Sequence, residues 1–334
     1  MGELLLSVIV PVYNAAATLN ACAASILDQL PQDSELLLVN DGSTDGCAAL
    51  CDALAAADAR VRALHQPNGG ASAARNAGLA AARGRYLQFV DADDQLMPGL
   101  YAAALPHLAG ADLFFFGIAG PGGLPRDRLP SGPVPGLASL RADFPYYLVE
   151  TGLFAALYNK IYRASLLRGL RFDPALRINE DLQFNMQALA RCGAVFFDPT
   201  PYYLYNDTAD GSLSRRLRTD LLEAEVYTRP AVLGFLSACG LNGEEAASLL
   251  RRRQGNVAAA QCALLLGRPG KLTFSQYRAL FSRALGPAHC RAAVLAWVKQ
   301  NYSAAPRAFY SACVRLRLAG GLAALCRLRG RSCP

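Results

Sequence analysis

Hydrophobic and polar positions alternate regularly along the first hundred residues. Short runs with strand propensity are separated by stretches in which apolar residues recur at helical spacing. The expected strands are 7–12, 35–39, 61–66 and 86–90. The expected helices lie within 19–30, 47–54 and 71–84. Strands that alternate with helices of this length are typical of crossover units, so the pattern predicts an α/β fold with a mainly parallel sheet flanked by helices.

The pattern is looser after Asp94, but it still predicts elements. The expected order is a helix at 98–108, a strand at 112–118, a Gly/Pro-rich loop at 120–136, a helical segment around 144–162, a helix from Asn179 to Gly193 and a strand at 194–206. In the fifth of these, Asn179 can cap the helix and Gly193 can end it. From about residue 217 the Leu, Ala and Arg content predicts a smaller all-helical domain.

Polar clusters follow three of the first four predicted strands. They are Tyr13-Asn14, Asn40-Asp41-Gly42 and the segment from Asp91 to Asp94. In open parallel sheets, ligands bind outside the carboxyl ends of the strands, so these clusters indicate a site at one edge. The carboxylates of Asp91, Asp93 and Asp94 would repel one another unless solvent, arginines or a divalent cation offsets their charge.

The charge is divided unevenly along the chain, whose net charge is +7. Of the 33 Lys and Arg residues, 15 follow Glu245, where there is no Asp or Glu, and the other 18 share the first 245 residues with all 26 acidic residues. A basic tail behind an acidic front suggests two parts with different partners. The tail is a candidate for binding an anionic membrane surface or polymer, or else a helical domain with a basic solvated face, used for packing or oligomerisation.

Cysteine usage and the start of the chain bear on the compartment. The ten cysteines include no C-x-x-C pair, so we interpret them as reduced thiols of a cytosolic protein. The start, MGELLLSVIVPVYN, has no basic region before its short apolar run, so we expect no secretory signal. We expect a cytoplasmic protein, with a peripheral position at the inner face of the membrane as one hypothesis for the tail. There is neither a G-x-G-x-x-G nor a Walker sequence.

Four fragments in order give a more specific indication. "SVIVPVYNAAATLNACAASILDQ", "LLLVNDGSTDG", "NGGASAARNAGLAAARGRYLQFVDADD" and "YNKIYRASLL...INEDLQFN" together resemble glycosyltransferase family 2. The resemblance spans about residues 5 to 215. It implies a GT-A fold and inverting sugar transfer from a nucleoside diphosphate donor. The division it implies is a catalytic domain at 1–215, with a donor half at 1–97 and an acceptor half at 98–215, before a basic helical accessory domain at 216–334.

The resemblance assigns a nucleotide site to residues at and near the ends of the first four predicted strands. It places Asp41 against the N3–H donor of uracil, Tyr13 against the base as a stacking ring, and Arg75 near the base or diphosphate. The remaining expected nucleotide-binding residues are Pro11, Asn14, Asn68, Gly69, Gly70 and Asp91. The alternative interpretation is local: Asp41 would be a turn former, and Arg75 would form a salt bridge to Asp41 or Asp91.

Asp91-Ala92-Asp93 matches the family's D-x-D motif. On an extended strand end both carboxylates would point to the same side. The resemblance then implies that Asp93 binds Mn²⁺ or Mg²⁺ and that Asp91 binds the ribose or a metal-bound water, with Asp94 as a supporting or acceptor-side carboxylate. A helix N-cap with a bulge is the structural alternative.

The acceptor side is assigned in the same way. Inverting transfer needs one base, and the resemblance favours Asp181, with Glu180 helping to hold the acceptor; plain helix capping is the alternative. Lys160 and Ser212 are further candidates for contacting the diphosphate or the acceptor, although Lys160 could equally be a surface charge. Many relatives have tryptophan where this chain has Tyr158, which leaves the acceptor wall open.

The expected function is metal-dependent transfer of a hexosyl or N-acetylhexosaminyl group from a UDP-sugar to a hydroxyl group. The acceptor would be a cell-surface polysaccharide, a lipid-linked glycan or a teichoic-type polymer. We expect no nucleic-acid partner, and an oligomer remains open. A catalytically silent nucleotide-sugar-binding protein and a sugar nucleotidyltransferase are the alternatives, although the latter would need a Gly-rich loop that PVYNAAATLN lacks.

Overall fold

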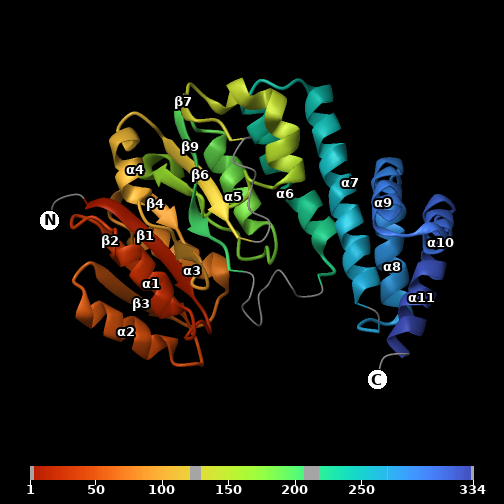
Figure 1. Cartoon of the computed structure of the whole chain (residues 1–334), viewed down its shortest axis with the longest axis horizontal. Helices are drawn as coiled ribbons and strands as arrows, with labels where there is room; N and C mark the ends of the chain where they lie inside the picture. Colours follow the sequence, from red (N-terminus) through yellow and green to blue (C-terminus); the bar gives the residue numbers. More distant parts are fainter. Residues whose placement is uncertain (1–3, 121–128, 207–217, 269, 332–334) are drawn as a thin grey trace. The chain divides into compact units, whose positions relative to one another are not determined.

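The computed structural model describes residues 4–120, 129–206, 218–268 and 270–331. The chain forms two compact units, one made of Met1–Ala142 and Leu153–Ser212 and the other of Asp143–Gly152 and Leu213–Pro334 (Figure 1). The short segment 143–152 therefore belongs to the second unit, although it precedes part of the first along the chain. The sequence pattern did not indicate that this segment belongs to the second unit.

The first unit is built on a nine-stranded sheet. Its order is β3-β2-β1-β4-β8-β6-β9-β5, and β7 pairs with β9. The strands are β1 (Leu4–Val12), β2 (Glu35–Asp41), β3 (Val61–Gln66), β4 (Gly84–Phe89), β5 (Gln95–Leu96), β6 (Leu113–Ala119), β7 (Gly132–Val134), β8 (Lys160–Arg163) and β9 (Val195–Leu204). Its helices are α1 (Leu19–Leu27), α2 (Cys47–Ala57), α3 (Ala71–Ala81), α4 (Leu100–Leu108) and α5 (Glu180–Leu189), with the 3₁₀ turns η2 (Leu137–Asp143) and η4 (Ala164–Leu167).

The first four strands confirm the predicted crossover units. β1 is parallel to both β2 and β4, and β2 is parallel to β3. Alternate residues of β1, from Leu6 to Val12, are fully buried in a core that also contains Leu19, Cys22 and Ile26 of α1. On the other face α3 lies directly on β1, because a Cβ on Gly78 would stand 2.3 Å from Cγ2 of Ile9. The carboxyl ends of β1, β2, β3 and β4 consequently share one edge.

The rest of the sheet is mixed. β8 is antiparallel to β4 and β6, β5 and β7 are antiparallel to β9, and β6 is parallel to β9. The helix expected through 144–162 is wrong in its second half, because Lys160–Arg163 is a strand, and β7 lies within the expected loop 120–136. Ile161 and Tyr162 are fully buried between β4 and β6, so tertiary pairing overrides the local helical pattern.

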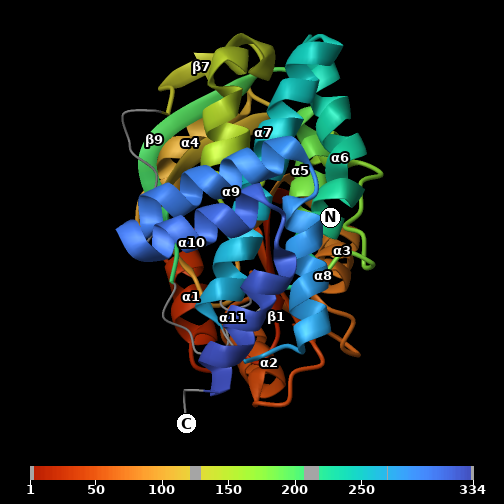
Figure 2. The same ribbon diagram turned by 90° about the vertical axis from the view of Figure 1, so that its right-hand side faces the viewer.

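The second unit is helical, as its composition predicts. It contains the π-helical turn η3 (Pro145–Glu150), α6 (Leu221–Ala238), α7 (Gly243–Gly267), α8 (Phe274–Leu285), α9 (Ala288–Asn301), α10 (Ala304–Arg315) and α11 (Ala319–Arg331). Asn242 and Thr273 form capping boxes at the starts of α7 and α8. α9 packs on α7 and α10, and α11 packs on α8 (Figure 2). Within the described residues, no helix is both long enough and apolar enough to cross a membrane.

Candidate active site

The loops that follow β1 and β2 are tied to each other by side-chain hydrogen bonds. The Oδ1 atom of Asn14 accepts from the backbone N–H of Thr44 at 2.8 Å, and the backbone N–H of Asn14 donates to Oγ of Ser43 at 3.1 Å. Asp45 accepts the N–H of Ala16 at 2.9 Å. These bonds hold the two loops in one arrangement at the carboxyl edge of the sheet, with the ring of Tyr13 53% exposed beside them.

Asp41, the last residue of β2, is almost completely buried and organises the loop after β3. Its Oδ1 atom accepts from Nε2 of Gln66 at 2.6 Å and from the N–H of Gly69 at 2.9 Å, and its Oδ2 atom accepts from the N–H of Gly70 at 2.7 Å. A carboxylate has about four acceptor positions, so one position on Oδ2 is available for a further donor. Asp41 is both the loop former of the local interpretation and a group with remaining acceptor capacity.

Glycine is required where these loops approach each other. A Cβ on Gly42, which has a φ of +66°, would stand 2.7 Å from the backbone nitrogen of Asn68. Asn68 in turn donates from Nδ2 to the carbonyl of Asp41 at 3.0 Å. Gly70 has a φ of +85° and directs its N–H at Asp41, a conformation that side-chain-bearing residues rarely adopt. The sequence NDG followed by PNGG thus builds a cradle of backbone around one carboxylate.

Arg75, in the second turn of α3, bonds to the turn after β4 and to the start of α5. Its guanidinium is buried and donates from Nη2 to Oδ1 of Asp91 and from Nη1 to Oε1 of Glu180, each at 3.0 Å. Burial alone would lower the pKa of Arg75, but Asp91, Glu180 and Asp181 together raise it, so this side chain stays charged. The predicted salt bridge to Asp91 is present, and the second bridge, to Glu180, was not expected.

The D-x-D segment is a turn and not a continuation of the strand. β4 ends at Phe89, and the N–H of Asp94 donates to the carbonyl of Asp91 at 3.1 Å. The expectation that Asp91 and Asp93 share one side of an extended strand is therefore wrong. Tyr203 of β9 holds the turn, since its hydroxyl accepts the N–H of Asp91 at 3.2 Å and donates to Oδ2 of Asp94 at 2.6 Å.

The three carboxylates of this turn have different surroundings. Asp94 is buried and also accepts the N–H of Asn206 at 2.7 Å; burial and the neighbouring Asp91 raise its pKa to about 7 despite these bonds. Burial and Asp91 also raise the pKa of Asp93. Among the described residues, none outside the turn donates a hydrogen bond to the carboxylate of Asp93 or to Oδ2 of Asp91. Asp94 is thus a structural anchor, whereas Asp93 lacks a compensating charge.

The start of α5 presents the two acidic residues expected on the acceptor side. Asn179 precedes α5 with a φ of +61° and, against expectation, makes no side-chain cap. Glu180 is bound to Arg75, and Asp181 is half-buried with the N–H of Leu182 donating to its Oδ1 atom at 2.7 Å. Burial and Glu180 raise the pKa of Asp181 to about 6, although Arg75 lowers it. A carboxylate with such a pKa is ionised at neutral pH and basic enough to accept a proton.

Comparisons with known proteins agree with this arrangement. A family model described as glycosyl transferase family 2 matches residues 7–166. The uncharacterized glycosyltransferase EpsJ of Bacillus subtilis is 33% identical over 248 residues, which cover 72% of this chain and 72% of EpsJ. The chain belongs to glycosyl transferase family 2. The succinoglycan biosynthesis protein ExoO of Rhizobium meliloti is 30% identical over 282 residues, covering 77% of this chain and 75% of ExoO.

Solved structures show that this glycosyltransferase has the GT-A fold. S. aureus TarS 1-349 in complex with UDP-GlcNAc matches with a TM-score of 0.68 and 20% identity over 96% of this chain and 90% of that one. The mannosyltransferase PcManGT from Pyrobaculum calidifontis in complex with GDP-Man and Mn2+ matches with a TM-score of 0.56 and 16% identity over 96% of this chain and 87% of that one. The predicted fold class, family and enzymatic nature are confirmed.

The structure does not support a contact with the diphosphate or acceptor for two further candidates in this glycosyltransferase, Lys160 and Ser212. Lys160 is completely buried: its Nζ donates to the carbonyls of Leu153 and Ala156 and to Oδ1 of Asn159, and it lies 4.4 Å from the ring centre of Phe115. A surface position for Lys160 is wrong, and nothing in its surroundings supports a contact with the diphosphate. Ser212 lies outside the described residues.

Sequence reasoning missed several supporting residues of the site. Gln66, Tyr203 and Asn206 each bond directly to Asp41 or Asp94. Tyr158 stacks on Tyr203 with ring centres 4.4 Å apart, and burial, Asp91 and Asp94 raise its pKa, so its half-buried ring borders the carboxylates. Only the tyrosine-rich composition of β9 could have indicated this layer.

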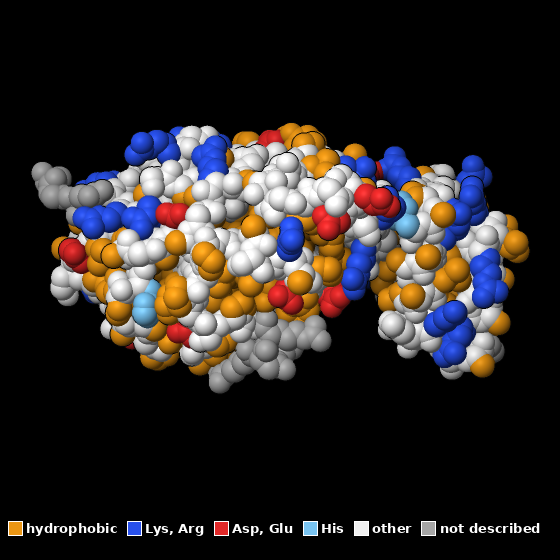
Figure 3. Space-filling model, turned by 90° about the horizontal axis from the view of Figure 1, so that it is seen from above, with side chains coloured by type: hydrophobic (Ala, Val, Ile, Leu, Met, Phe, Trp, Pro, Cys, Tyr) orange, Lys and Arg blue, Asp and Glu red, His pale blue; other side chains and the backbone are white. Residues whose placement is uncertain are grey.

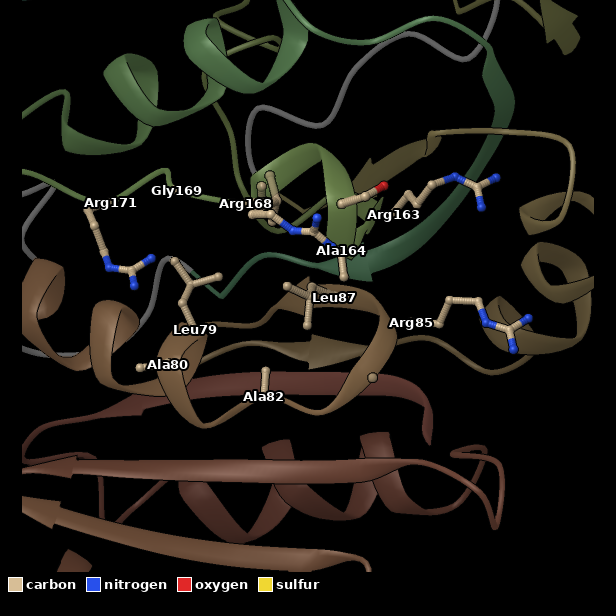
Figure 4. Close-up of a pocket in the computed structure, with 13 residues that line it drawn as sticks. Leu79, Ala80, Ala82, Arg85, Leu87, Arg163, Ala164, Arg168, Gly169 and Arg171 are labelled. Carbon is tan, nitrogen blue, oxygen red and sulfur yellow. The ribbon is translucent and has the colours of Figure 1, made fainter. Parts of the chain in front are cut away.

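A separate cavity of about 460 Å³ lies at the opposite end of β4 (Figure 4). It is lined by the end of α3, the start of β4 and the η4 segment, and includes four arginines: Arg85, Arg163, Arg168 and Arg171. Arg163 is already held by Asp112 and by the carbonyls of Leu108, Ala109 and Ala111. This cavity is not part of the carboxyl-edge site. Among the described residues, no group of three or more His, Cys, Asp or Glu is arranged to hold a metal ion.

Proposed function

We propose that this enzyme is an inverting, divalent-metal-dependent glycosyltransferase that moves a hexosyl or N-acetylhexosaminyl group from a UDP-sugar to an acceptor hydroxyl. The observation that carries the proposal is the position of Arg75, which bonds to Asp91 on the donor side and to Glu180 on the acceptor side. One buried cation thereby fixes the D-x-D turn relative to the start of α5. The proposed donor-side carboxylate Asp91 and Glu180, the neighbour of the proposed base Asp181, would thus be held by a single guanidinium.

The nucleotide would bind at Asp41. Its remaining acceptor position on Oδ2 suits the N3–H of uracil, which cytosine lacks. The exposed ring of Tyr13, on the neighbouring loop after β1, would stack on the base. Asn14, Asn68 and Gly70 would shape the loops around it, whereas Pro11, expected in the same loop, lies within β1 and pairs with Val39. TarS, with its UDP-GlcNAc complex, supports a UDP-sugar, while PcManGT, with GDP-Man, makes the guanine nucleotide the competing choice.

Asp93 and Asp91 fit the requirements of a hard divalent cation. Both oxygens of the Asp93 carboxylate and Oδ2 of Asp91 accept no hydrogen bond from another described residue, and the pKa of Asp93 is raised by its burial and by the neighbouring Asp91. Oxygen ligands of this kind suit Mn²⁺ or Mg²⁺. When bound, such an ion supplies neutralisation of the charge that develops on the leaving diphosphate. Asp94 would keep the turn in place through Tyr203 and Asn206.

Asp181 would act as the base. Its pKa of about 6 makes it a carboxylate at neutral pH that can take the proton of the acceptor hydroxyl during in-line attack on the anomeric carbon. Glu180, fixed by Arg75, would hold the acceptor. The half-buried ring of Tyr158 would form part of the acceptor wall. Capping of α5 does not account for both residues, because Glu180 is bound to α3.

The acceptor would be a growing cell-surface polysaccharide, a lipid-linked glycan or a teichoic-type polymer. The name of ExoO, a succinoglycan biosynthesis protein, supports an extracellular polysaccharide. We place the enzyme in the cytoplasm at the inner face of the membrane, where nucleotide sugars and lipid-linked acceptors meet.

The test is a donor screen with purified protein. Release of nucleoside diphosphate is measured from UDP-glucose, UDP-galactose, UDP-N-acetylglucosamine and GDP-mannose, each with Mn²⁺ or EDTA, and the anomeric configuration of the product is determined by NMR. We expect Mn²⁺-dependent turnover of a UDP-sugar with inversion. A retained configuration, or full turnover in EDTA, would contradict the proposal, and a preference for GDP-mannose would contradict the uracil assignment of Asp41.

A further inference from the structure

A second apolar face distinguishes α10 from the other helices near the end of the chain. One side of α10 is buried in the helical core through Tyr310, Cys313 and Val314. Phe309 and, seven residues on, Leu316, which follows the last residue of α10, lie to one flank of this buried side and are 47% and 66% exposed; Leu318 in the following turn is 48% exposed. Residues seven apart lie on the same side of a helix, so Phe309 and Leu316 form one stripe. We refer to Phe309, Leu316 and Leu318 with Arg315 and Arg317 as the α10 face.

The arginines of the α10 face are not neutralised. Arg315 ends α10, and Arg317, with a φ of +56°, forms the turn to α11. Within the part of the chain that the structure describes, neither guanidinium has a hydrogen-bond or ion-pair partner. No Asp or Glu follows Glu245, so the surrounding helices α8 to α11 carry positive charge alone. Figure 3 shows Lys and Arg side chains interspersed with hydrophobic ones on the visible part of this unit.

Exposed Phe and Leu side chains between unpaired arginines match the chemistry of one kind of surface. Apolar side chains gain free energy by entering the boundary between headgroups and acyl chains, and each arginine gains from anionic headgroups. An anionic polymer would satisfy the arginines but would leave Phe309 and Leu316 in water. A second copy of the chain would cover the apolar residues but would bring two acid-free basic surfaces together, which costs electrostatic free energy.

We propose that the α10 face docks on a membrane surface that contains anionic lipid. Phe309, Leu316 and Leu318 enter the headgroup boundary, and Arg315 and Arg317 contact lipid phosphates. This inference deepens the proposed function, because it rests on an acceptor that is presented at a membrane. It is nevertheless tested independently of donor binding and transfer.

The experiment is flotation of the full-length protein with vesicles. One set is phosphatidylcholine alone, and the other contains about one third phosphatidylglycerol, each over a KCl series from about 0.05 to 0.5 M. The variants are Arg315→Glu/Arg317→Glu and Phe309→Ser/Leu316→Ser. The matched controls are Arg141→Glu/Arg168→Glu, on exposed arginines of the first unit, and Leu233→Ser, an exposed leucine of α6. Thermal stabilisation by UDP with Mn²⁺ is measured for every variant.

We expect binding to the anionic vesicles that weakens as KCl rises. Each pair of substitutions in the α10 face should lower the partition coefficient at least about tenfold, while the controls change it by less than about twofold. Equal binding to neutral vesicles, no binding to anionic vesicles, or equal losses in the controls would overturn the inference. A dimer that the Phe309→Ser/Leu316→Ser variant abolishes, with no vesicle binding, would identify the face as an interface between copies. If UDP with Mn²⁺ does not stabilise the wild-type protein, the proposed function is contradicted. The vesicle binding measured in the same experiment still decides whether the α10 face docks on a membrane.

Discussion

Most charged side chains at the carboxyl edge of the sheet are held by hydrogen bonds and ion pairs, whereas those of the α10 face are exposed. At the edge, Asp41 accepts three hydrogen bonds, Asp94 accepts two, and Arg75 bridges Asp91 and Glu180. On the α10 face, Arg315 and Arg317 are exposed and, among the described residues, unpaired. Charges fixed by neighbours create a site whose geometry exists before a ligand arrives, and this suits chemistry. Exposed, unpaired charges suit association that depends on ionic strength.

The largest effect on transfer is expected from a substitution of Asp93, the carboxylate of the edge that has no compensating charge among the described residues. Asp93→Asn should lower transfer about 10³-fold or more, because metal-assisted charge stabilisation contributes several kcal/mol. It should also remove the Mn²⁺ dependence of UDP binding, measured by calorimetry. Asp28→Asn, an exposed carboxylate at the end of α1, is the control. Unchanged UDP affinity in Mn²⁺ would refute the metal assignment.

The next largest effect concerns the base. Asp181→Asn should lower transfer about 10²- to 10⁴-fold while UDP binding is retained. In the wild-type enzyme, kcat should fall as the pH drops through about 6, the pKa to which burial and Glu180 raise Asp181. Because this pKa is raised by folding, protonation of Asp181 stabilises the folded state, and its contribution to unfolding free energy declines as the pH rises from about 4 to about 6. An active Asp181→Asn enzyme beside an inactive Glu180→Gln enzyme would show that Glu180 is the base.

Arg75 tests whether the two sides of the edge are coupled. Arg75→Lys keeps the charge but replaces the planar fork with a single ammonium, which cannot make both bonds in the same geometry. We expect transfer to fall about 10²-fold, since misplacement of this order is costly. In Arg75→Gln, which removes the charge, we expect the pH midpoint of kcat to rise, because the charge of Arg75 lowers the pKa of Asp181. A reduced kcat with an unchanged pH midpoint would argue against coupling between Arg75 and the base.

A substitution of Lys160 tests whether this side chain stabilises the fold or binds the donor diphosphate. Lys160→Met leaves the carbonyls of Leu153 and Ala156 and the side chain of Asn159 without their shared donor. Unfolding free energy should fall by about 2 to 4 kcal/mol, measured by denaturant titration. The KM for the donor should change less than about threefold in the folded fraction, because the ammonium is enclosed. A large rise in KM with full stability would restore Lys160 as a diphosphate ligand.

The smallest effect is expected for substitutions in the α10 face on the affinity for UDP, because the account assigns UDP binding to the carboxyl edge alone. Arg315→Glu/Arg317→Glu should change the UDP affinity by less than about twofold, because both side chains are exposed and charges in water are strongly screened by salt. Calorimetry at about 0.15 M salt is the measurement. A tenfold change would show that the α10 face contributes to the donor site and that the contrast drawn above is false.

The local pattern predicted the donor half well. In 1–97 the strands β1 to β4 and the helices between them are encoded over a few neighbouring residues, from the apolar run of β1 to the PNGG before α3, whereas β5, which pairs with β9, was not predicted. Prediction failed where long-range contacts decide. β8 is a strand because it fits between β4 and β6, and the turn at Asp91 is held by Tyr203, more than a hundred residues away. The second bond of Arg75 joins α3 to α5 and has no local signature.

The site residues show the same division. Asp41, Asp91, Arg75 and Asp181 stood out through motifs at strand and helix ends, and the structure brings Arg75 to bond Asp91 and, through Glu180, to the start of α5 beside Asp181. Their roles in binding and transfer stay predictions. The surface alternative for Lys160 is wrong, because the sequence does not reveal that three acceptors surround its ammonium group in the core.

The most direct test of the central claim is the thermal stability of the purified enzyme with UDP, CDP or GDP, each with Mn²⁺ or EDTA. A ligand that binds the folded state raises Tm according to its concentration relative to Kd. The account predicts a rise with UDP that requires Mn²⁺ and is lost in Asp93→Asn, with smaller shifts for CDP and GDP. A shift with GDP alone, or a UDP shift that persists in EDTA, would contradict the assignment of Asp41 to uracil or of Asp93 to the metal, respectively.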